Sequence, residues 1–273
     1  MIKDYKTAVD NIRDIIKKYI IDNSIKSLVL GISGGIDSAL CAVLAYDVCL
    51  ELGIPLIGRS ITIETNKAEE IERAAAIGKN FTTNFKEIDL TDVFKVMANQ
   101  LTENDDLDDP NAVSHKIRRG NMKARTRMMY LYDLAAKHKG MVLSTDNYTE
   151  LLLGFWTLHG DVGDYGMVQN LWKTEIYGMS RFLASQMPNE KKDALESCIT
   201  AVATDGLGIT RSDLDQIGAG TYEEVDQILL KLFDPQGPVN FMDHPVIKRK
   251  INSEFKRNNP YNIPRNEITS APY

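Results

Sequence analysis

The chain has 273 residues, of which 43% are hydrophobic, and its formal net charge is −6. This composition is typical of a globular protein, and the length favours a single domain over residues 1–273 rather than two independent folds. The acidic balance argues against a nucleic-acid partner, because such proteins usually carry a basic excess that meets the phosphates. The longest uninterrupted apolar run, Ala39–Tyr46, is too short to cross a bilayer, so no membrane partner is expected.

The cysteines and the N-terminal segment indicate the compartment. Cys41, Cys49 and Cys198 contain no close pair, and the chain has four histidines. Neither a disulfide framework nor a zinc site is therefore indicated. The first residues also lack the apolar core of a signal peptide. We expect a cytoplasmic protein with buried, reduced thiols.

Short apolar runs alternate with helical patterns through the first half of the chain. An amphipathic helix is predicted at residues 4–20, where apolar side chains recur at three- and four-residue spacing. The runs expected to form strands are Ser27–Ile32, Leu56–Ile61, Phe85–Leu90 and Met141–Ser144. The helices expected after the first three are Ser38–Leu52, Asn66–Asn80 and Thr91–Leu101. This alternation predicts an α/β fold, a doubly wound parallel sheet with helices on both faces.

The rest of the chain is less regular. Thr102–Asn111 holds five acidic residues and a proline and predicts an exposed loop, whereas Lys116–Arg127 holds six cations. Four glycines between Gly154 and Gly166 indicate a functional loop. Helical patterns return at Lys173–Gln186, Lys191–Thr200, Glu223–Leu232 and Pro245–Phe255, while Thr204–Gly220 and the tail after Asn258 look irregular.

The most informative motif is Ser33–Ser38, with the sequence SGGIDS, between a predicted buried strand and the first turn of a helix. Two adjacent glycines let backbone N–H groups approach an anion, and the helix N-terminus adds partial positive charge. The serine hydroxyls can donate to phosphate oxygens, and Asp37 can ligate Mg²⁺. The motif predicts a nucleotide phosphate site. The alternative is a glycine turn capped by Asp37 or Ser38.

The same motif resembles the pyrophosphate loop of the ATP pyrophosphatase enzymes, which cleave ATP to AMP and pyrophosphate. Neither a Walker sequence nor a Rossmann fingerprint is present. Arg119–Tyr130, Val142–Asn147 and Glu150 further resemble the ammonia-dependent NAD synthetases within that superfamily, and the resemblance covers nearly the whole chain. It implies the adenine nucleotide alpha hydrolase-like fold of the ATP pyrophosphatase type.

The resemblance also implies roles for individual residues. Asp37 and Asp161 would be catalytic, with Asp161 near the ammonia, and Asp37 and Glu150 would ligate Mg²⁺. Judged by sequence alone, Glu150 would be a solvated helix residue. Contacts with deamido-NAD are implied for Arg125, Asp164 and Lys256. Contacts with ATP are implied for Gly31, Ile32, Ser33, Gly34, Gly35, Ile36, Asp37, Ser38, Arg59, Thr145, Lys173 and Thr204.

Residue chemistry supports part of this assignment. Two anionic nucleotides require cations, and the guanidinium of Arg125 suits charge-assisted pairing with phosphate. Lys123, Arg125 and Arg127 cannot share one helix face, so some of them must be solvated. Thr145 and Asp146 follow a predicted strand at its carboxyl end, where open α/β sheets bind ligands, although a helix cap is the alternative.

Two segments depart from the family pattern. Leu158 stands where the family usually has a lysine that would help hold deamido-NAD. The loop around it is also one residue shorter, so the implied contact of Asp164 with deamido-NAD has weaker support. Ala203–Leu207 replaces a Pro-Ser/Thr-Ala-x-Leu loop, in which Thr204 is retained. These changes point to a divergent branch of the family.

Taken together, the resemblance implies conversion of deamido-NAD, ATP and ammonia to NAD, AMP and pyrophosphate through an acyl adenylate, with Mg²⁺ as cofactor. No glutaminase domain is recognised, so free ammonia is the expected nitrogen source, and a separate ammonia-supplying protein is a candidate partner. A homodimer is expected. The alternatives are another ATP pyrophosphatase-type amidating or tRNA-modifying ligase, or a nucleotide-binding module without catalysis.

Overall fold

The computed structural model describes residues 1–64, 66–101, 109, 112–204, 212–235, 237 and 239–269. The predicted acidic loop Thr102–Asn111 lies outside this part of the chain except for Asp109, as do Asp205–Leu207 of the divergent loop. Within the described residues, no helix combines the length and the apolar character that crossing a membrane requires.

Five parallel strands form one sheet in the order β3-β2-β1-β4-β5, which confirms the predicted parallel α/β architecture. Leu28 at the start of the central strand lies opposite both Leu56 and Met141. The predicted four strands are found with small shifts at their ends, whereas β5 has two residues and is too short for a periodic signal. The strands are β1 (Leu28–Gly31), β2 (Leu56–Thr62), β3 (Asn84–Asp89), β4 (Met141–Ser144) and β5 (Tyr165–Gly166).

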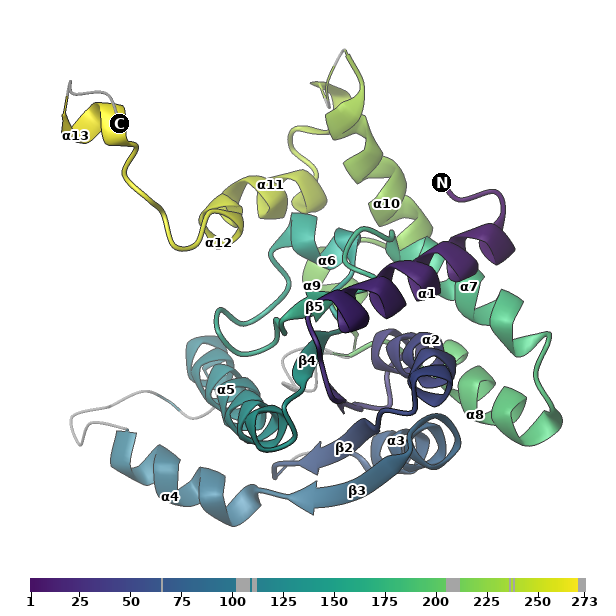
Figure 1. The fold of residues 1–273 in the computed structure, drawn as a ribbon. Helices are drawn as coiled ribbons and strands as arrows, with labels where there is room; N and C mark the ends of the chain where they lie inside the picture. The colour runs from purple at the N-terminus through teal and green to yellow at the C-terminus, as the bar shows by residue number, and fades with distance from the viewer. Residues whose placement is uncertain are drawn as a thin grey trace.

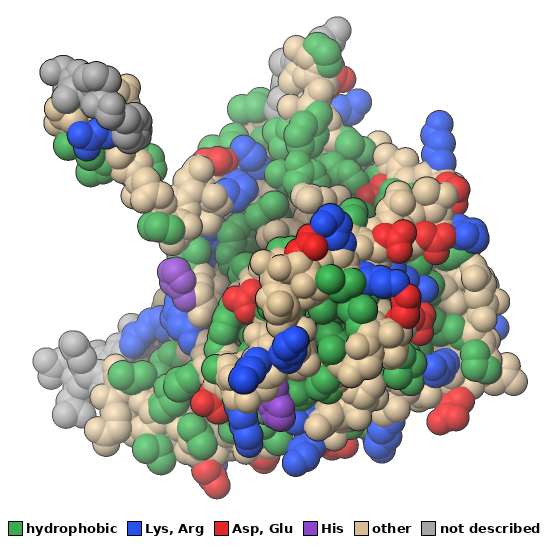
Figure 2. All heavy atoms as spheres, in the orientation of Figure 1, with side chains coloured by type: hydrophobic (Ala, Val, Ile, Leu, Met, Phe, Trp, Pro, Cys, Tyr) green, Lys and Arg blue, Asp and Glu red, His purple; other side chains and the backbone are tan. Residues whose placement is uncertain are grey.

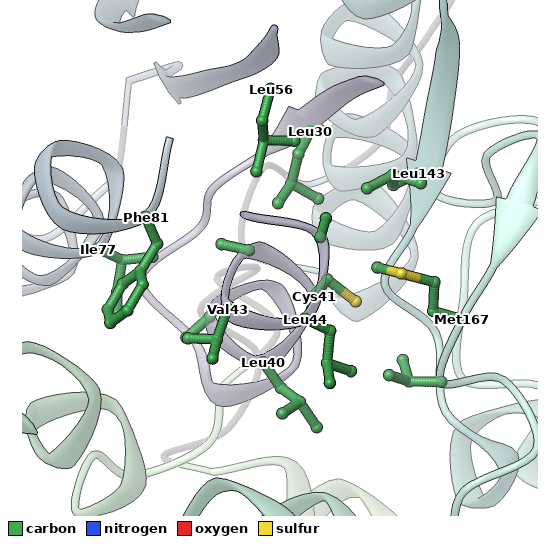
Figure 3. Packing of buried hydrophobic residues seen from close by; sticks show 14 of the residues in the cluster. Leu30, Leu40, Cys41, Val43, Leu44, Leu56, Ile77, Phe81, Leu143 and Met167 are labelled. Atoms are coloured by element: carbon green, nitrogen blue, oxygen red, sulfur yellow. The ribbon is translucent and has the colours of Figure 1, made fainter. Parts of the chain in front are cut away.

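Helix α2 (Ile36–Leu52) is central to the packing on one face of the sheet. It is apolar around most of its circumference, which is typical of a largely buried helix, and its exposed side chains Asp47, Leu50 and Glu51 lie in its last two turns. Figure 3 shows its side chains pointing toward Leu30 and Leu56 of the strands on one side and toward Ile77 and Phe81 on another. The helices packed around it are α1 (Tyr5–Asp22), α3 (Ala68–Phe81), α7 (Lys173–Ala184) and α8 (Asn189–Ile199).

The opposite face of the sheet is covered by α4 (Thr91–Leu101) and α5 (Val113–Lys137). Val29 and Val142 point to this side, where they pack with Met128 of α5, while the neighbouring residues of their strands belong to the first cluster. This alternation along each strand buries both faces of the sheet, as a doubly wound fold requires.

A third cluster lies beyond the carboxyl ends of the strands (Figure 1). The predicted helix Pro245–Phe255 is divided at Ser253. Two short helices, α9 (Asp213–Ile217) and α13 (Arg265–Ile268), form in segments expected to be irregular, because helices of four or five residues carry little periodicity. The last helix stands away from the body (Figures 1 and 2). The other elements of this region are α6 (Tyr148–Leu153), α10 (Tyr222–Leu230), η1 (Lys231–Phe233), η2 (Val239–Phe241), α11 (Pro245–Asn252) and α12 (Glu254–Arg257).

Candidate active site

A cavity of about 370 Å³ opens at the carboxyl ends of β1, β2 and β4. The strand order changes direction between β1 and β4, and such a point is where open α/β sheets bind ligands. The structure therefore brings together residues that lie far apart in the sequence. The predicted residues that line the cavity are Gly31, Ile32, Ser33, Gly34, Gly35, Ile36, Asp37, Arg59, Thr145, Glu150, Asp161, Lys173 and Thr204.

The predicted phosphate loop connects β1 to α2 and is held together by its own hydroxyl groups. Ser38 Oγ donates to the Gly35 carbonyl at 3.1 Å and accepts from the Ser33 backbone N–H at 3.2 Å. Ser33 Oγ accepts from the Gly35 N–H at 3.2 Å. Ser38 is buried and does not line the cavity, so its side chain shapes the loop.

Gly34 fixes the position of this loop against α3. Its φ is +82°, and a Cβ built on it would lie 2.3 Å from the Glu70 carbonyl oxygen. Arg73, one turn along α3, donates from Nε to the Gly34 carbonyl at 3.0 Å. Only glycine fits this backbone conformation and this close approach.

An ion cluster lies beside the loop. Lys173 Nζ is 2.5 Å from Asp37 Oδ2 and 3.1 Å from Glu150 Oε1, and the lysine is only 2% exposed. Asn147 donates from Nδ2 to the other oxygen of Asp37 at 2.9 Å. The cluster joins the starts of α2, α6 and α7, which are remote in sequence.

Local sequence explains how α6 presents Glu150. Asn147 caps this helix, because its side chain accepts from the Glu150 backbone N–H, while Glu150 Oε2 accepts from the Asn147 N–H. This reciprocal arrangement is a capping box. Glu150 is therefore a cavity residue and not a solvated one, and the helix cap is Asn147 rather than Thr145 or Asp146.

The start of α7 is fixed in a similar way. The Lys173 backbone N–H donates to Thr149 Oγ1, and Thr149 donates to the buried carboxylate of Asp226 on α10. Asp226 also accepts from the backbone N–H and the hydroxyl of Thr174. Asp226 thus holds α6 and α7 together, and in this arrangement Lys173 lies between the carboxylates of Asp37 and Glu150.

Burial and charge perturb the groups of this cluster. Burial raises the pKa of Glu150, an effect that Lys173 opposes and Asp37 reinforces. Burial by itself lowers the pKa of Lys173, but the carboxylates of Asp37 and Glu150 raise it well above its ordinary value overall. Lys173 therefore stays positively charged and balances the carboxylates.

Two further carboxyl groups line the same cavity. Asp161 Oδ2 accepts from the Thr157 N–H at 2.5 Å, and burial raises the pKa of Asp161. Asp146 Oδ2 accepts from Ser144 Oγ at 2.6 Å, and burial raises the pKa of Asp146 to about 6. This side of the cavity is thus acidic.

Arg59 lines the cavity from β2. Arg59 is 4% exposed, and it donates from Nη1 to the carbonyls of Gly58 and Asn84 and from Nη2 to the Asn84 side chain. Thr204 Oγ1 lies 3.4 Å from Glu70 at the rim. Arg59 is therefore anchored in the sheet beneath the cavity.

The three residues predicted to contact deamido-NAD do not line this cavity. Arg125 donates from Nε to the Leu158 carbonyl and borders a second, open hollow. Asp164 accepts from the Tyr132 hydroxyl and from the Val142 N–H, both at 2.9 Å. Lys256 donates to the carbonyls of Gly154 and Trp156 at the base of the substrate loop. Their predicted role remains a prediction.

Sequence reasoning missed several residues that line the cavity. Lys123 and Arg127 lie one turn apart on α5 and face it together, whereas Arg125 faces away. The four-residue spacing was the available signal, because side chains at i and i+4 share a helix face. Glu70, Arg73 and Asp146 also line the cavity. Of these three, only Asp146 had a signal in the sequence, because it lies just after a predicted strand.

Comparisons with known proteins agree with this geometry. A family model described as NAD synthase matches residues 8–260. An NH3-dependent NAD(+) synthetase from Thermoplasma acidophilum is 30% identical over 266 residues, which cover 95% of this chain and 98% of that protein. An NH3-dependent NAD synthetase structure from Campylobacter jejuni aligns with a TM-score of 0.70 at 24% identity, covering 96% of this chain and 100% of that one. The structure of NMN synthetase from Francisella tularensis aligns with a TM-score of 0.76 at 22% identity, covering 95% and 98%. The two structures establish the fold.

Proposed function

Because the chain belongs to the NAD synthase family, we propose that it is a cytoplasmic ligase that amidates deamido-NAD with ammonia, using ATP and forming NAD, AMP and pyrophosphate. The observation that carries the proposal is the convergence on one cavity of the Ser33–Ser38 loop, Glu150, Asp161 and Lys173. The loop and Lys173 suit a polyphosphate, and the carboxylates suit a metal ion and ammonia.

The carboxylate pair of Asp37 and Glu150 fits a magnesium ion. Within the described residues, no group of three or more Asp, Glu, His or Cys side chains could hold a metal. Mg²⁺ is commonly bound through one or two carboxylates together with substrate phosphates and water, and both carboxylates here already share one cation. When bound, the ion would spread the charge of the departing pyrophosphate.

The first half-reaction joins the two nucleotides. The carboxylate oxygen of the nicotinate attacks the α-phosphorus of ATP, a P–O bond forms, and the bond to pyrophosphate breaks, which leaves an acyl adenylate. The loop N–H groups and Lys173 would bind the phosphates and stabilise the developing charge. This role is supported by the fixed start of α7, where the Lys173 backbone N–H donates to Thr149 and Thr149 donates to Asp226. No covalent bond to the protein is needed, and juxtaposition of the two bound nucleotides supplies much of the acceleration.

The second half-reaction replaces AMP by ammonia. The nitrogen forms a bond with the acyl carbon and gives up one proton to a base or to water, the bond to AMP breaks, and AMP leaves with the electron pair. Asp161 would position the ammonia or accept a proton from ammonium, and its raised pKa makes the carboxylate a better proton acceptor. Thr157 keeps Asp161 in place through its backbone N–H.

The remaining assignments also belong to this proposal. Arg125, Asp164 and Lys256 would contact deamido-NAD from outside the cavity, and residues 1–273 would act as one domain in a homodimer, with free ammonia as the nitrogen source. Leu158 removes the charge that the family usually places beside this substrate. The acceptor therefore needs a direct test.

The test measures NAD, AMP and pyrophosphate from ATP, Mg²⁺ and deamido-NAD, in parallel with ammonium and with glutamine. We expect all three products with ammonium and none with glutamine alone. A parallel arm replaces deamido-NAD by nicotinic acid mononucleotide, because Leu158 changes the acceptor side of the site. If only the mononucleotide is amidated, the acceptor is the mononucleotide and not deamido-NAD. If ATP binds but neither acceptor stimulates pyrophosphate release, the proposed ligase activity is contradicted.

A further inference from the structure

The cations that line the cavity differ in what balances their charge. Lys173 is paired with Asp37 and Glu150, and Lys123 Nζ lies 3.1 Å from Glu64 Oε2. Arg127 also lines the cavity, but among the described residues no carboxylate oxygen lies within 4.0 Å of its guanidinium. Arg127 is partly buried and its charge has no direct ion pair, so it is available to an anionic ligand of the cavity.

The neutral contacts of Arg127 leave part of its guanidinium available. Nε donates to the Ile61 carbonyl and Nη2 donates to Asn66 Oδ1, each at 3.2 Å. Nη1 donates to no residue in the described part of the chain. Burial lowers the pKa of Arg127, although a guanidinium keeps its charge at any ordinary pH. The two contacts thus fix the orientation of a cation that still faces the cavity with free donors.

The position of Arg127 relative to Asp161 narrows the choice of anion. The charges of Arg127 and Asp161 influence each other, as do those of Arg127 and Glu70, yet Arg127 forms no ion pair with either, so the charged atoms lie more than 4.0 Å apart. Arg127 and Asp161 both line the same cavity. Thr157, which holds Asp161, also donates from its hydroxyl to Asn121 on α5, the helix that carries Arg127. The loop and the helix are therefore held at a fixed separation.

We propose that Arg127 binds the α-phosphoryl group of the nucleotide, the anion that ATP, the acyl adenylate and AMP have in common. This inference rests on the proposed function. In the acyl adenylate a single oxygen joins this phosphorus to the carbon that ammonia attacks. A cation on the phosphoryl group and a carboxylate at the ammonia would therefore lie on either side of this centre, and Arg127 and Asp161 line the same cavity.

A second arginine marks the other end of the phosphate chain. Arg73 also has no ion pair among the described residues, but its Nε contacts the carbonyl of Gly34 within the phosphate loop. Arg73 therefore contacts the loop directly, whereas Arg127 contacts Ile61 at the end of β2 and Asn66 just after it and is influenced by the charges of Asp161 and Glu70. We therefore expect the loss of Arg127 to weaken the binding of AMP more than the binding of pyrophosphate.

The test measures binding of AMP and, separately, of inorganic pyrophosphate in the presence of Mg²⁺ by calorimetry. Arg127→Gln is compared with Arg127→Lys and with Lys137→Gln, an exposed substitution on the same helix. We expect Arg127→Gln to weaken AMP binding about tenfold or more, as for loss of a charged hydrogen bond, and to leave pyrophosphate binding within about twofold. Arg127→Lys should weaken AMP less, and Lys137→Gln should match the wild type.

Unchanged AMP affinity in Arg127→Gln, or equal losses for AMP and pyrophosphate, overturns the assignment. Circular dichroism on each variant establishes that it is folded. Should Arg127→Gln fail to fold, the same comparison is made with Arg127→Lys. These titrations need no turnover of deamido-NAD, so a failure of the proposed amidation reaction would be seen in the wild-type assay and distinguished from a failure here.

Discussion

At the scale of single residues, the most informative contact is the one between Lys173 and Asp37. Each carboxylate oxygen of Asp37 has a polar partner, Lys173 on one side and Asn147 on the other. An asparagine at this position keeps the shape of the side chain but removes the charge. The substitution Asp37→Asn therefore tests the charge of Asp37 with little change in its packing.

Asp37→Asn is expected to reduce deamido-NAD-dependent pyrophosphate release on the order of 100-fold or more, because a charge that acts in the transition state is lost. The measurement is initial-rate pyrophosphate release at saturating ATP and Mg²⁺. Asp14→Asn, at an exposed position of α1, is the matched control and should retain full activity. Full activity in Asp37→Asn would refute its assignment to the catalytic centre.

Asp146 predicts a pH dependence of stability. Burial, reinforced by the charges of Asp161 and Asp37, raises its pKa from 3.8 to about 6 in the folded protein. A carboxyl with a raised folded pKa stabilises the fold at low pH, and this contribution is lost as the pH rises from about 4 to about 6. Asp146→Asn should therefore become more stable relative to the wild type over this window, by up to about 3 kcal/mol.

The measurement is the free energy of unfolding in urea at pH 4, 5, 6 and 7 for both proteins. The amide introduced by Asp146→Asn keeps an oxygen that can accept from Ser144, so the local hydrogen bond survives the substitution. Asp14→Asn serves again as the exposed control. A stability difference that does not change with pH would show that Asp146 ionises as freely in the folded chain as in the unfolded one.

At the scale of elements, the phosphate loop depends on its contact with α3. Gly34→Ala should destabilise the protein by more than Gly53→Ala, although both glycines have positive φ. At Gly53 an added Cβ meets nothing within 4 Å, so only the backbone conformation costs about 1–2 kcal/mol. At Gly34 the Cβ also strikes the Glu70 carbonyl, which lies in the backbone of a helix.

Urea unfolding of the two variants, together with ATP titration, tests this expectation. Gly34→Ala should bind ATP much more weakly, because the loop must move, while Gly53→Ala should bind as the wild type does. Equal destabilisation of the two variants would mean that the loop and α3 adjust to each other without difficulty.

Much of the element order could be predicted from the sequence, and the failures have physical causes. The first four strands and most of the longer helices carry clear periodicity, and they were found close to their predicted bounds. The longest helix, α5, was not predicted, and only its run of cations was noted. The two-residue strand β5 and the short helices α6, α9 and α13 are too short to show a periodic pattern of apolar residues. Placement of Glu150 failed for another reason. The capping box of Asn147 and Glu150 is a local signal that was not used, whereas the contact of Glu150 with Lys173 joins distant segments and has no local signal.

At the scale of the whole molecule, the expected homodimer can be tested through the second hollow. Met129, Tyr132 and Val162 expose apolar side chains beside Arg125, and Met129 is 57% exposed. Light scattering during size-exclusion chromatography should give the mass of a dimer for the wild type. Met129→Glu should give a monomer, because the new charge would be buried at an apolar interface.

Leu50→Glu is the matched control for this experiment, since Leu50 is 53% exposed at the far end of α2. It should remain dimeric. A monomeric wild type would contradict the expected assembly altogether, whereas a dimeric Met129→Glu would place the interface on another surface.

The sequence predicted the fold class and most of the cavity lining, because strand-helix alternation places the ends of parallel strands at one edge. It did not separate Lys123 and Arg127 from Arg125, since a run of cations does not state which helix face is buried. The third apolar cluster was also not predicted, because it joins short helices from four separate segments.

The hydroxyl contacts between Ser33 and Ser38 have a consequence for the thermodynamics of nucleotide binding. The loop is closed on itself and fastened to α3 by contacts within the protein. Its conformational entropy has therefore been lost already in folding, and a nucleotide meets a preorganised receptor rather than a segment that it must first order. Association should then proceed without a slow rearrangement of the loop, and affinity should depend on charge and fit.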